Sequence, residues 1–391
     1  MIGTLQAGPE FRSFNNKIVL VTGELSGEIH ALHLVKAITR LLPIKFSGVG
    51  STRLAEAGVR IIYDYGRISL TGLSEIFVKL RYIREAYGRL KKHLIEEKPS
   101  LIILVDFPGF NLKIAHMAKK EGIPVIYFIP PQLWAWRESR IKKIKKFVDH
   151  VICILPFEKA FYDSHGVDVT YIGHPFTDIV KPKLGRQEFL DMVGAKEGDA
   201  MVTIMPGSRE NEFTRHMPLL LEVADELVMR VDNLKVLLPL ADSIEDRIIQ
   251  KYSVGRSVIP IRGLSYDALS YSDTAIMASG SATLEAAILG TPTIVVYKVS
   301  KLSYVVAKAL VKVKYISLPN IIMGEEIFPE FIQHISTGDI VEKTLYMLKN
   351  GRKGLEKRMT EIKRRLSSED SYHLAGESIV RFLEDRYGAI F

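Results

Sequence analysis

Residues 278–292, ASGSATLEAAILGTP, join an apolar run to a helix-forming segment through a turn of small residues. The run at 274–277 predicts a strand, and 282–289 is rich in strong helix formers. A helix that begins after so tight a turn has unpaired backbone N–H groups, and the small residues at 279–281 let a phosphate approach them closely. The pattern predicts a nucleotide-diphosphate site, but a Ser-capped helix followed by Gly and Pro stop signals explains it equally well.

Other features of the second half of the chain also suit a nucleotide ligand. Glu285 lies about one turn into the helix, where its carboxylate repels phosphate but accepts hydrogen bonds from a ribose diol. Gly207 and Arg209 follow the apolar run at 202–205, so the glycine permits close backbone approach and the guanidinium offers a planar fork for phosphate oxygens. A later turn carries the amide of Asn320, which suits either a ligand or a plain loop. Two such loops on one sheet edge strengthen the prediction of phosphate binding.

Composition places the chain among globular proteins that bind anions. Its 391 residues are enough for two domains of about 150–200 residues each. The 53 basic and 45 acidic residues give a net charge of +8, which favours phosphate groups, nucleic acid or acidic lipid without choosing among them. A single cysteine, Cys153, excludes an internal disulfide and fits a reducing compartment. Because we find neither a membrane-span pattern nor a signal-peptide pattern, we expect a cytoplasmic protein.

Apolar runs and helical segments alternate along most of the chain. Runs rich in Val, Ile and Leu recur at 18–21, 102–105, 125–128 and 151–155, and again at 202–205, 236–238, 275–277 and 293–296. Because such runs suit strands buried on both faces, they predict two doubly wound α/β units, each a parallel sheet with helices on both sides. A charged, turn-rich stretch at 181–185 separates the two units. We therefore expect domains at 17–180 and 181–365, and a terminal segment, 366–391, whose helix is able to return to the first domain.

Ligands of open α/β sheets bind beyond the carboxyl ends of the strands, which directs attention to the residues after each run. GELSGE at 23–28 lacks the GxGxxG spacing of a dinucleotide-binding turn and argues against an NAD enzyme. Asp106 follows the run at 102–105, where poor solvation raises the pKa of a carboxyl and suits it to act as a general base. Capping of the next helix by Asp106 or by Asn111 is an alternative interpretation.

Two segments of the first half combine aromatic or apolar side chains with cations. Trp134 and Trp136 follow an apolar run, where they suit either packing or contact with a sugar or acyl chain. The basic pattern at 137–147 is explained by an amphipathic helix with a solvated cationic face. Apolar residues recur every three or four positions across 70–94 with cations between them, which predicts a long helix that lies either against the sheet or in a lipid interface.

Eight short motifs carry a family resemblance. They are GELSGE at 23–28, DFPGFN at 106–111, PPQLWAWR at 130–137, LPFEKAFY at 155–162, IGHPF at 172–176, PGSRENE at 206–212, ASGSATLE at 278–285 and SLPN at 317–320. Together they resemble the lipid-A-disaccharide synthases, bacterial inverting glycosyltransferases, from about residue 17 to 324 and more weakly to the end. The family's opening motif is usually GExSGD with a small third residue, and Leu25 and Glu28 depart from it.

The resemblance implies a GT-B fold, in which two doubly wound parallel-sheet domains face each other across a cleft. In the family the donor is UDP-2,3-diacylglucosamine, the acceptor is 2,3-diacylglucosamine 1-phosphate (lipid X), and UDP leaves without a metal or other cofactor. By position, Asp106 resembles the base for the acceptor 6-hydroxyl, with Glu24 and Ser26 as further catalytic positions. The residues matched to donor and UDP binding are Gly207, Ser208, Arg209, Glu212, Ser279, Gly280, Ser281, Ala282, Thr283, Glu285 and Asn320.

The acylated substrates of the family also imply a membrane-facing element. Contacts with acyl chains or lipid are expected at Leu70, Leu73, Ile76, Phe77, Leu80, Trp134 and Trp136. The resemblance thus implies an enzyme of lipid A biosynthesis that is cytoplasmic and peripherally associated with the cytoplasmic face of the inner membrane. It implies no nucleic-acid partner, and a homodimer is left open as its assembly.

Two other functions stay compatible with the residues. A nucleotide-sugar epimerase of the same architecture needs the donor site but no lipid-facing element. A basic nucleic-acid-binding protein is suggested by the net charge of +8 and the cations at 137–146, although the chain lacks the alternating aromatic and basic residues typical of such proteins. Formation of a disaccharide from two acylated sugars distinguishes the synthase from both.

Overall fold

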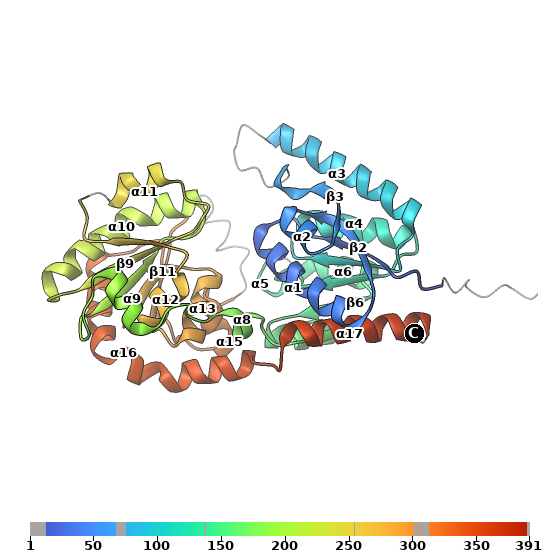
Figure 1. The fold of residues 1–391 in the computed structure, drawn as a ribbon. Coiled ribbons are helices and arrows are strands. Elements are labelled where there is room, and N and C mark those ends of the chain that lie inside the picture. Colours follow the sequence, from blue (N-terminus) through green and yellow to red (C-terminus); the bar gives the residue numbers. More distant parts are fainter. Residues whose placement is uncertain are drawn as a thin grey trace, which may run out of the picture. The chain divides into compact units, whose positions relative to one another are not determined.

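A computed structural model of the chain describes residues 13–67, 76–136, 138–253, 255–300, 304 and 313–388. Its contacts divide the chain into two compact units: the first ends at Pro175 and resumes from Ser368, and the second comprises the residues between. The division falls before the turn-rich stretch at 181–185, because α8 (Phe176–Ile179) already packs against α13 (Ser281–Leu289) of the second unit. Each unit is a parallel sheet with helices on both faces (Figure 1).

Within the described ranges the first sheet has seven parallel strands in the order β3-β2-β1-β4-β5-β6-β7. The strands are β1 (Lys17–Val21), β2 (Lys45–Gly50), β3 (Arg60–Asp64), β4 (Leu101–Val105), β5 (Val125–Phe128), β6 (His150–Cys153) and β7 (Val169–Tyr171). The four predicted runs of the first half correspond to β1, β4, β5 and β6. The sequence pattern misses β2, β3 and β7, because β2 contains two glycines and β3 and β7 are partly exposed edge strands without a continuous apolar run.

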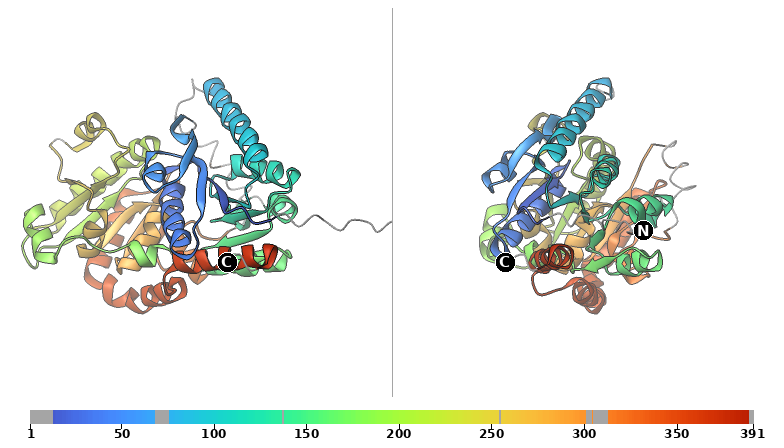
Figure 2. Two further views of the ribbon diagram at one scale, coloured as in Figure 1. Left: turned by 45° about the vertical axis from the view of Figure 1, so that its right-hand side comes forward. Right: turned by 90° about the vertical axis from the view of Figure 1, so that its right-hand side faces the viewer.

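The helices of the first unit cover both faces of its sheet. They are α1 (Leu25–Leu41), α2 (Thr52–Glu56), α3 (Ile76–Glu97), α4 (Pro108–Lys120), α5 (Leu133–Trp136), α6 (Ile141–Phe147), α7 (Pro156–Ser164) and α17 (Ser371–Tyr387), with 3-10 turns at Tyr65–Arg67 and Glu138–Arg140. Although α17 comes from the other end of the chain, it packs against α1 (Figure 2). The amphipathic pattern predicted across 70–94 corresponds to α3, whose Ala86, Leu90 and Leu94 are buried in the core, so this part of the helix packs against the rest of the unit.

Among the described residues the second sheet has six parallel strands in the order β10-β9-β8-β11-β12-β13. The strands are β8 (Met201–Met205), β9 (Lys235–Leu240), β10 (Ile259–Arg262), β11 (Thr274–Ala278), β12 (Thr293–Tyr297) and β13 (Glu330–Ile332). The helices, besides α8 and α13, are α9 (Arg186–Val193), α10 (Glu210–Arg230), α11 (Asp246–Ser253), α12 (Ser265–Tyr271), α15 (Leu318–Met323) and α16 (Thr337–Leu366). The predicted runs are β8, β9, β11 and β12, whereas β10 and β13 are half-exposed edge strands that lack such a run.

In both sheets the strand order reverses between two central neighbours. β1 pairs directly with β4, and β8 pairs directly with β11. Ligands of open α/β sheets bind at such a switch point, beyond the carboxyl ends of the strands. The loops that follow these four strands carry the GELSGE, DFPGFN, PGSRENE and ASGSATLE motifs. The motifs that predict chemistry therefore lie at the switch point of each unit.

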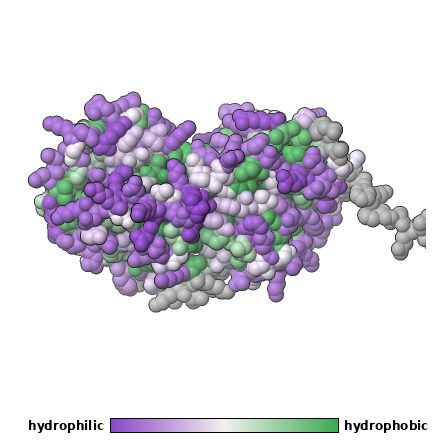
Figure 3. All heavy atoms as spheres, turned by 90° about the horizontal axis from the view of Figure 1, so that it is seen from below, coloured by the Kyte–Doolittle hydropathy of each residue, from purple (hydrophilic) through white to green (hydrophobic). Residues whose placement is uncertain are grey.

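One face of the molecule is mainly polar. Seen from below, hydrophilic residues are interrupted by small hydrophobic patches (Figure 3). One large apolar side chain in the open is Leu25 of the GELSGE loop, which is 48% exposed. None of the helices that the structure describes combines the length and the apolar character needed to cross a membrane.

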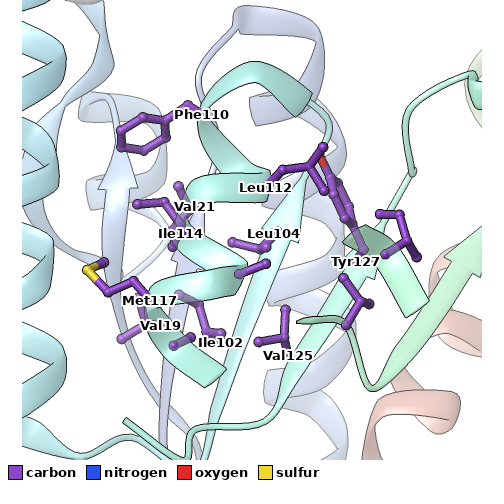
Figure 4. Packing of buried hydrophobic residues seen from close by; sticks show 14 of the residues in the cluster. Val19, Val21, Ile102, Leu104, Phe110, Leu112, Ile114, Met117, Val125 and Tyr127 are labelled. Atoms are coloured by element: carbon purple, nitrogen blue, oxygen red, sulfur yellow. The ribbon is translucent and has the colours of Figure 1, made fainter. Parts of the chain in front are cut away.

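The core of the first unit fixes the strand ends that carry its motif loops. One face of β1, β4 and β5 packs beneath α4 (Figure 4), through Val19, Val21, Ile102, Leu104, Val125 and Tyr127 on the strands and Phe110, Leu112, Ile114 and Met117 on the helix. Each fully buried side chain of this kind stabilises the fold by about 1.5–3 kcal/mol. The loops after β1 and β4 thus start from immobile strands.

Candidate active site

Asp106 lies at the carboxyl end of β4, in a backbone conformation that few residues other than glycine adopt. Asp106 and Phe107 have φ values of 47° and 46°, in the left-handed region. The carbonyl oxygen of Asp106 accepts hydrogen bonds from Asn111 Nδ2 and from the Tyr127 hydroxyl, both at 2.8 Å, which hold this turn. Phe107 occupies the N-cap position of α4, and no side chain caps that helix. The capping interpretations of Asp106 and Asn111 are therefore wrong.

The GELSGE loop packs directly against the Asp106 loop. A Cβ at Gly23 would lie 2.3 Å from the ring of Phe107, so only glycine fits there. Glu24 and Ser26 are exposed where α1 begins. Burial, and then the negative charge of Glu24, raise the pKa of Asp106 above its usual value. The structure thus brings the two predicted carboxylates together and makes Asp106 the better proton acceptor.

Glu28, which departs from the family motif, serves the fold. Its buried carboxylate accepts hydrogen bonds from Ser51 N at 2.6 Å, from Ser51 Oγ at 2.8 Å and from the Tyr65 hydroxyl at 3.0 Å. These hydrogen bonds offset the cost of burying the charge. Glu28 therefore ties α1 to the turn that begins α2.

The tryptophan loop is held by a buried carboxylate that sequence reasoning did not single out. Trp134 Nε1 donates to Glu158 Oε1 at 3.1 Å, and Leu155 N donates to Oε2 at 3.2 Å. Glu158 is 2% exposed, and burial raises its pKa to about 7. The Trp134 ring also packs edge-on against Phe157, with 4.7 Å between centroids. The sequence does contain a signal for this role, because Glu158 is a single acidic residue directly after an apolar run.

Among the residues expected to contact lipid, the structure describes the side chain of Trp134. Leu70 and Leu73 lie outside the described residues, and only the backbone is described for Ile76, Phe77, Leu80 and Trp136. Trp134 is half-buried against α7. Lipid contact by this group therefore stays a prediction.

The PGSRENE loop joins β8 to α10 and folds back over its own helix. Gly207 has a φ of 118°, and a Cβ there would lie 2.7 Å from the Cβ of Glu212, so glycine is required. Arg209 is exposed, and its Nη1 donates to Glu212 Oε1 at 3.1 Å. The carbonyl of Ser208 accepts from Ser243 Oγ at 2.5 Å. The geometry gives Glu212 the role of orienting Arg209, since a carboxylate itself repels a phosphate.

His216 joins this loop to the residues after β12, a role that the sequence does not reveal. Its Nδ1 lies 2.9 Å from the carbonyl oxygen of Pro206, and Lys298 N donates to its Nε2 at 2.9 Å. Nε2 thus accepts a hydrogen bond, which places the ring proton on Nδ1. Burial lowers the pKa of His216, in keeping with a neutral ring. The two hydrogen bonds fix the backbone at the start of the PGSRENE loop.

The turn between β11 and α13 leaves the first N–H groups of the helix without a side-chain cap. Gly280 is the N-cap residue, and Ser279 Oγ donates instead to the carbonyl oxygen of Ile316 at 2.9 Å. A Cβ at Gly280 would meet no described atom within 4 Å, so the approach to the turn is open. The Ser-capped explanation is therefore wrong. The N–H groups of Ser281 and Ala282, at the positive end of the helix dipole, are available to an anion.

Thr283, one residue further, uses its hydroxyl and its N–H within the helix start. Its side chain is buried, and its hydroxyl and its N–H both donate to the carbonyl oxygen of Gly280, at 2.8 and 3.2 Å. Both donors close the first turn of α13, and the role of Thr283 in UDP binding stays a prediction.

Asn320 also uses its polar groups inside the protein. Its Nδ2 donates to the carbonyl oxygen of Phe328 at 2.7 Å and to Glu330 Oε1 at 2.8 Å, while its Oδ1 accepts from the N–H groups of Ile327 and Phe328. The same Glu330 carboxylate accepts from Ser317 N and Oγ, at 2.9 and 2.7 Å. Both amide groups of Asn320 have partners inside the second unit, and its role in UDP binding stays a prediction. Asn320 positions the 317–320 loop beside Ser279.

We expect Asn320→Ala to lower the free energy of unfolding of the second unit by about 2–4 kcal/mol, because several buried polar groups lose their partners. Urea denaturation measures this loss. Asn350→Ala is the matched control, because the Asn350 amide is exposed and donates to a carbonyl of its own helix. A loss below about 1 kcal/mol, the worth of one ordinary hydrogen bond, would contradict the assignment.

Glu285 differs from Asn320 in that its carboxylate is unsatisfied. It makes no hydrogen bond or ion pair with any residue that the structure describes, and burial raises its pKa to about 7. Burial and, next, the charge of Glu285 raise the pKa of Tyr266 to about 12, which reveals Tyr266 as a neighbour that the sequence did not predict. A half-buried carboxylate without a partner among the described residues suits a ligand that carries adjacent hydroxyls.

Comparison with known proteins tests the family prediction. A family model described as lipid-A-disaccharide synthetase matches residues 18–381. The chain is 44% identical to lipid-A-disaccharide synthase of Syntrophus aciditrophicus, over 82% of this chain and 85% of that protein. It is 38% identical to the synthase of Geobacter sulfurreducens, over 83% and 85%, and 38% identical to that of Nitrosococcus oceani, over 90% and 92%.

Solved structures share the fold at low sequence identity. A co-structure of S. aureus MnaA with UDP matches with a TM-score of 0.63 at 16% identity, over 94% of this chain and 96% of that chain. UDP-GlcNAc 2-epimerase of Neisseria meningitidis, bound to UDP-GlcNAc, matches at 0.60 and 14%, over 94% and 100%. A glycosyltransferase of Rickettsia africae matches at 0.55 and 10%, over 97% and 100%.

These structural likenesses confirm the predicted fold, two doubly wound parallel-sheet units of the GT-B type, and do not separate transferases from epimerases. The sequence relatives do separate them, because the family model spans nearly the whole chain and the relatives are well above 30% identical. The chain belongs to the lipid-A-disaccharide synthase family of glycosyltransferases.

Proposed function

We propose that the chain transfers 2,3-diacylglucosamine from UDP-2,3-diacylglucosamine to the 6-hydroxyl of 2,3-diacylglucosamine 1-phosphate. The products are the β-1,6-linked lipid A disaccharide 1-phosphate and UDP. The proposal rests on membership of the lipid-A-disaccharide synthase family, whose reaction belongs to lipid A biosynthesis. The residue roles are supported by the groups that lie at the two switch points. In the first unit this group is Asp106, a carboxyl of raised pKa. In the second unit the groups are the uncapped start of α13 and Arg209 of the PGSRENE loop.

In the first unit, Asp106 acts as the general base. As the acceptor oxygen attacks the anomeric carbon on the face opposite UDP, its proton passes to the Asp106 carboxylate, and the configuration inverts. The raised pKa of Asp106 makes it a stronger acceptor than an ordinary aspartate. Glu24 and Ser26, exposed beside it, orient the acceptor sugar.

In the second unit, fixed positive groups stabilise the leaving UDP. Bond cleavage puts negative charge on the diphosphate, and the N–H groups of Ser281 and Ala282, the helix dipole and Arg209 oppose that charge without having to reorganise. Gly207 and Gly280, with Ser208 and Ser279 beside them, let the diphosphate reach the backbone. Glu285 accepts hydrogen bonds from the ribose hydroxyls, and Glu212 holds the Arg209 fork.

The acyl chains of both substrates place the reaction at a membrane surface, and we assign the contact to residues 70–80 together with Trp134 and Trp136. Apolar side chains enter the lipid while neighbouring cations meet anionic headgroups, at the cytoplasmic face of the inner membrane. Co-sedimentation with anionic phospholipid vesicles tests this role. Leu73→Glu with Phe77→Glu should reduce the bound fraction, and unchanged binding would refute it.

Product analysis tests the proposed function. Given labelled UDP-2,3-diacylglucosamine and 2,3-diacylglucosamine 1-phosphate, the purified chain should release UDP and form a labelled disaccharide 1-phosphate. Conversion of a UDP-sugar to its epimer, with no disaccharide, would instead support a nucleotide-sugar epimerase.

We expect Glu24→Gln to move the acidic limb of the kcat/KM profile to lower pH. A base works only when deprotonated, so activity rises with pH through the pKa of Asp106. The charge of Glu24 is the second cause, after burial, of that raised pKa, and the amide removes it. Initial rates from acid to neutral pH measure the shift, with Glu56→Gln, an exposed acid of the same unit, as control. A limb that stays in place would show that Glu24 does not act on Asp106.

A further inference from the structure

A cluster of reactive side chains lies away from the motif loops, at the amino ends of the last two strands of the first sheet. His150 begins β6, Asp168 precedes β7, and Ser378 lies on α17. His150 Nδ1 is 2.7 Å from Asp168 Oδ2, and His150 Nε2 is 3.2 Å from Ser378 Oγ. A hydroxyl, an imidazole and a carboxylate joined in this order are the parts of a serine nucleophile with its base and the group that orients the base.

The hydrogen bonds fix the direction of proton transfer. When His150 Nδ1–H donates to Asp168, Nε2 is left as an acceptor. Two hydroxyls lie within reach of Nε2, Ser378 Oγ at 3.2 Å and Thr170 Oγ1 at 3.1 Å, and Ser378 Oγ donates to Thr170 Oγ1 at 3.3 Å. Rotation of the Ser378 hydroxyl turns its proton from Thr170 Oγ1 to His150 Nε2, which lies 3.2 Å from Ser378 Oγ. His150 itself is buried, which keeps the ring in this orientation.

The cluster opens into a cavity of about 340 Å³ that His150, Asp168 and Ser378 all line. Arg381 and Phe382 line the same cavity from α17, and Arg381 follows Ser378 by three residues, so both project from one face of the helix. The guanidinium is able to donate to an oxygen that becomes negative next to Ser378. The Phe382 ring, 6.1 Å from the His150 ring, supplies an apolar wall.

We propose that Ser378, His150 and Asp168 form a second catalytic centre that hydrolyses small carboxylic esters. Ser378 Oγ bonds to the carbonyl carbon while its proton moves to His150 Nε2, and the oxyanion faces Arg381. The ester C–O bond then breaks, and His150 returns the proton to the departing alcohol. Water attacks the acyl-serine, again giving its proton to His150, and the carboxylic acid leaves with Ser378 restored. Ester and water are the only reactants, and nothing is oxidised or reduced.

Two features of the cluster limit its rate. The Asp168 side chain is 70% exposed, so solvent weakens its hold on the imidazolium. The oxyanion meets a flexible side chain, because the N–H groups around Ser378 are used in the helix. We therefore expect the centre to act on activated or short-chain esters, with about 10²–10³-fold assistance from the base, and not on amides.

Labelling and hydrolysis by the full-length protein test the proposal together. A fluorophosphonate probe should modify Ser378, located by mass spectrometry of the α17 peptide, and p-nitrophenyl acetate should be hydrolysed above the spontaneous rate. Ser378→Ala should lose both, whereas Ser253→Ala, a helix serine that donates to the carbonyl oxygen of Ile249, should keep both. The absence of label at Ser378 in the unmodified chain would overturn the proposal whatever the variants do.

Asp168→Asn separates catalysis from a role in docking α17. Asp168 acts through His150 as a positioning residue, and its exposure lets the variant fold while the Ser378 hydroxyl stays in place. It should lower kcat for the ester about tenfold or more with KM unchanged, since only the stabilisation of the imidazolium is weakened. Equal kcat in the variant and the unmodified chain, with α17 docked as judged by thermal melting, would reduce the cluster to a packing contact.

Discussion

Asp106→Asn is expected to lower kcat for disaccharide formation by about 10³-fold, because an amide cannot take the proton of the acceptor hydroxyl. Asparagine tolerates the left-handed backbone that Asp106 adopts, so the loop after β4 should keep its conformation. The charge is lost while the shape is kept. Rates at saturating donor and acceptor measure the loss, and UDP affinity by calorimetry should stay unchanged, since the groups that we propose to bind UDP belong to the second unit.

The control for this prediction is Asp163→Asn, which removes an exposed carboxylate of α7 that pairs with Lys159. It should leave both kcat and UDP affinity as they are. Near-normal turnover by Asp106→Asn would rule out its role as the base. If Glu24→Gln were then inactive, the base would be Glu24, the carboxylate whose charge raises the pKa of Asp106.

Arg209→Ala should lower kcat/KM by about 10²–10³-fold, the cost of removing one fixed donor from a developing negative charge. The Arg209 guanidinium is exposed and fastened to the chain through Glu212, so its removal should leave the fold intact. Because UDP itself carries the charge that Arg209 meets, the inhibition constant of UDP should rise as well. Steady-state kinetics with UDP as product inhibitor gives both quantities.

Two variants distinguish the bidentate hydrogen bonding of Arg209 from the effect of its positive charge. Arg209→Lys keeps the charge but loses the bidentate geometry, so its kcat/KM should fall between those of the alanine variant and the unmodified chain. Arg215→Ala removes another exposed cation of α10 outside the motif and should change little. If Arg215→Ala cost as much as Arg209→Ala, the effect would be one of general charge and the clamp would be refuted.

The central strands of both sheets were predictable because each is buried on both faces and is therefore largely apolar. β4, for example, reads LIILV and is fully buried. The edge strands were not, since β3 and β13 are half-exposed and their sequences carry no such constraint. The uncapped start of α13 was left open by the sequence, because Ser279 suits a cap as well as it suits its observed hydrogen bond to Ile316.

The amino-acid sequence by itself determined the fold class, the family and the chemical groups at the strand ends, because buried strands and phosphate-binding turns each restrict the residue types allowed. The tertiary structure alone decided which of those groups are free to act. Asn320 is saturated by partners that include Glu330, whereas the Glu285 carboxylate has no hydrogen-bond partner among the described residues. The reason is that a side chain has a fixed number of hydrogen bonds to make, and its partners come from strands and loops that only folding brings to it.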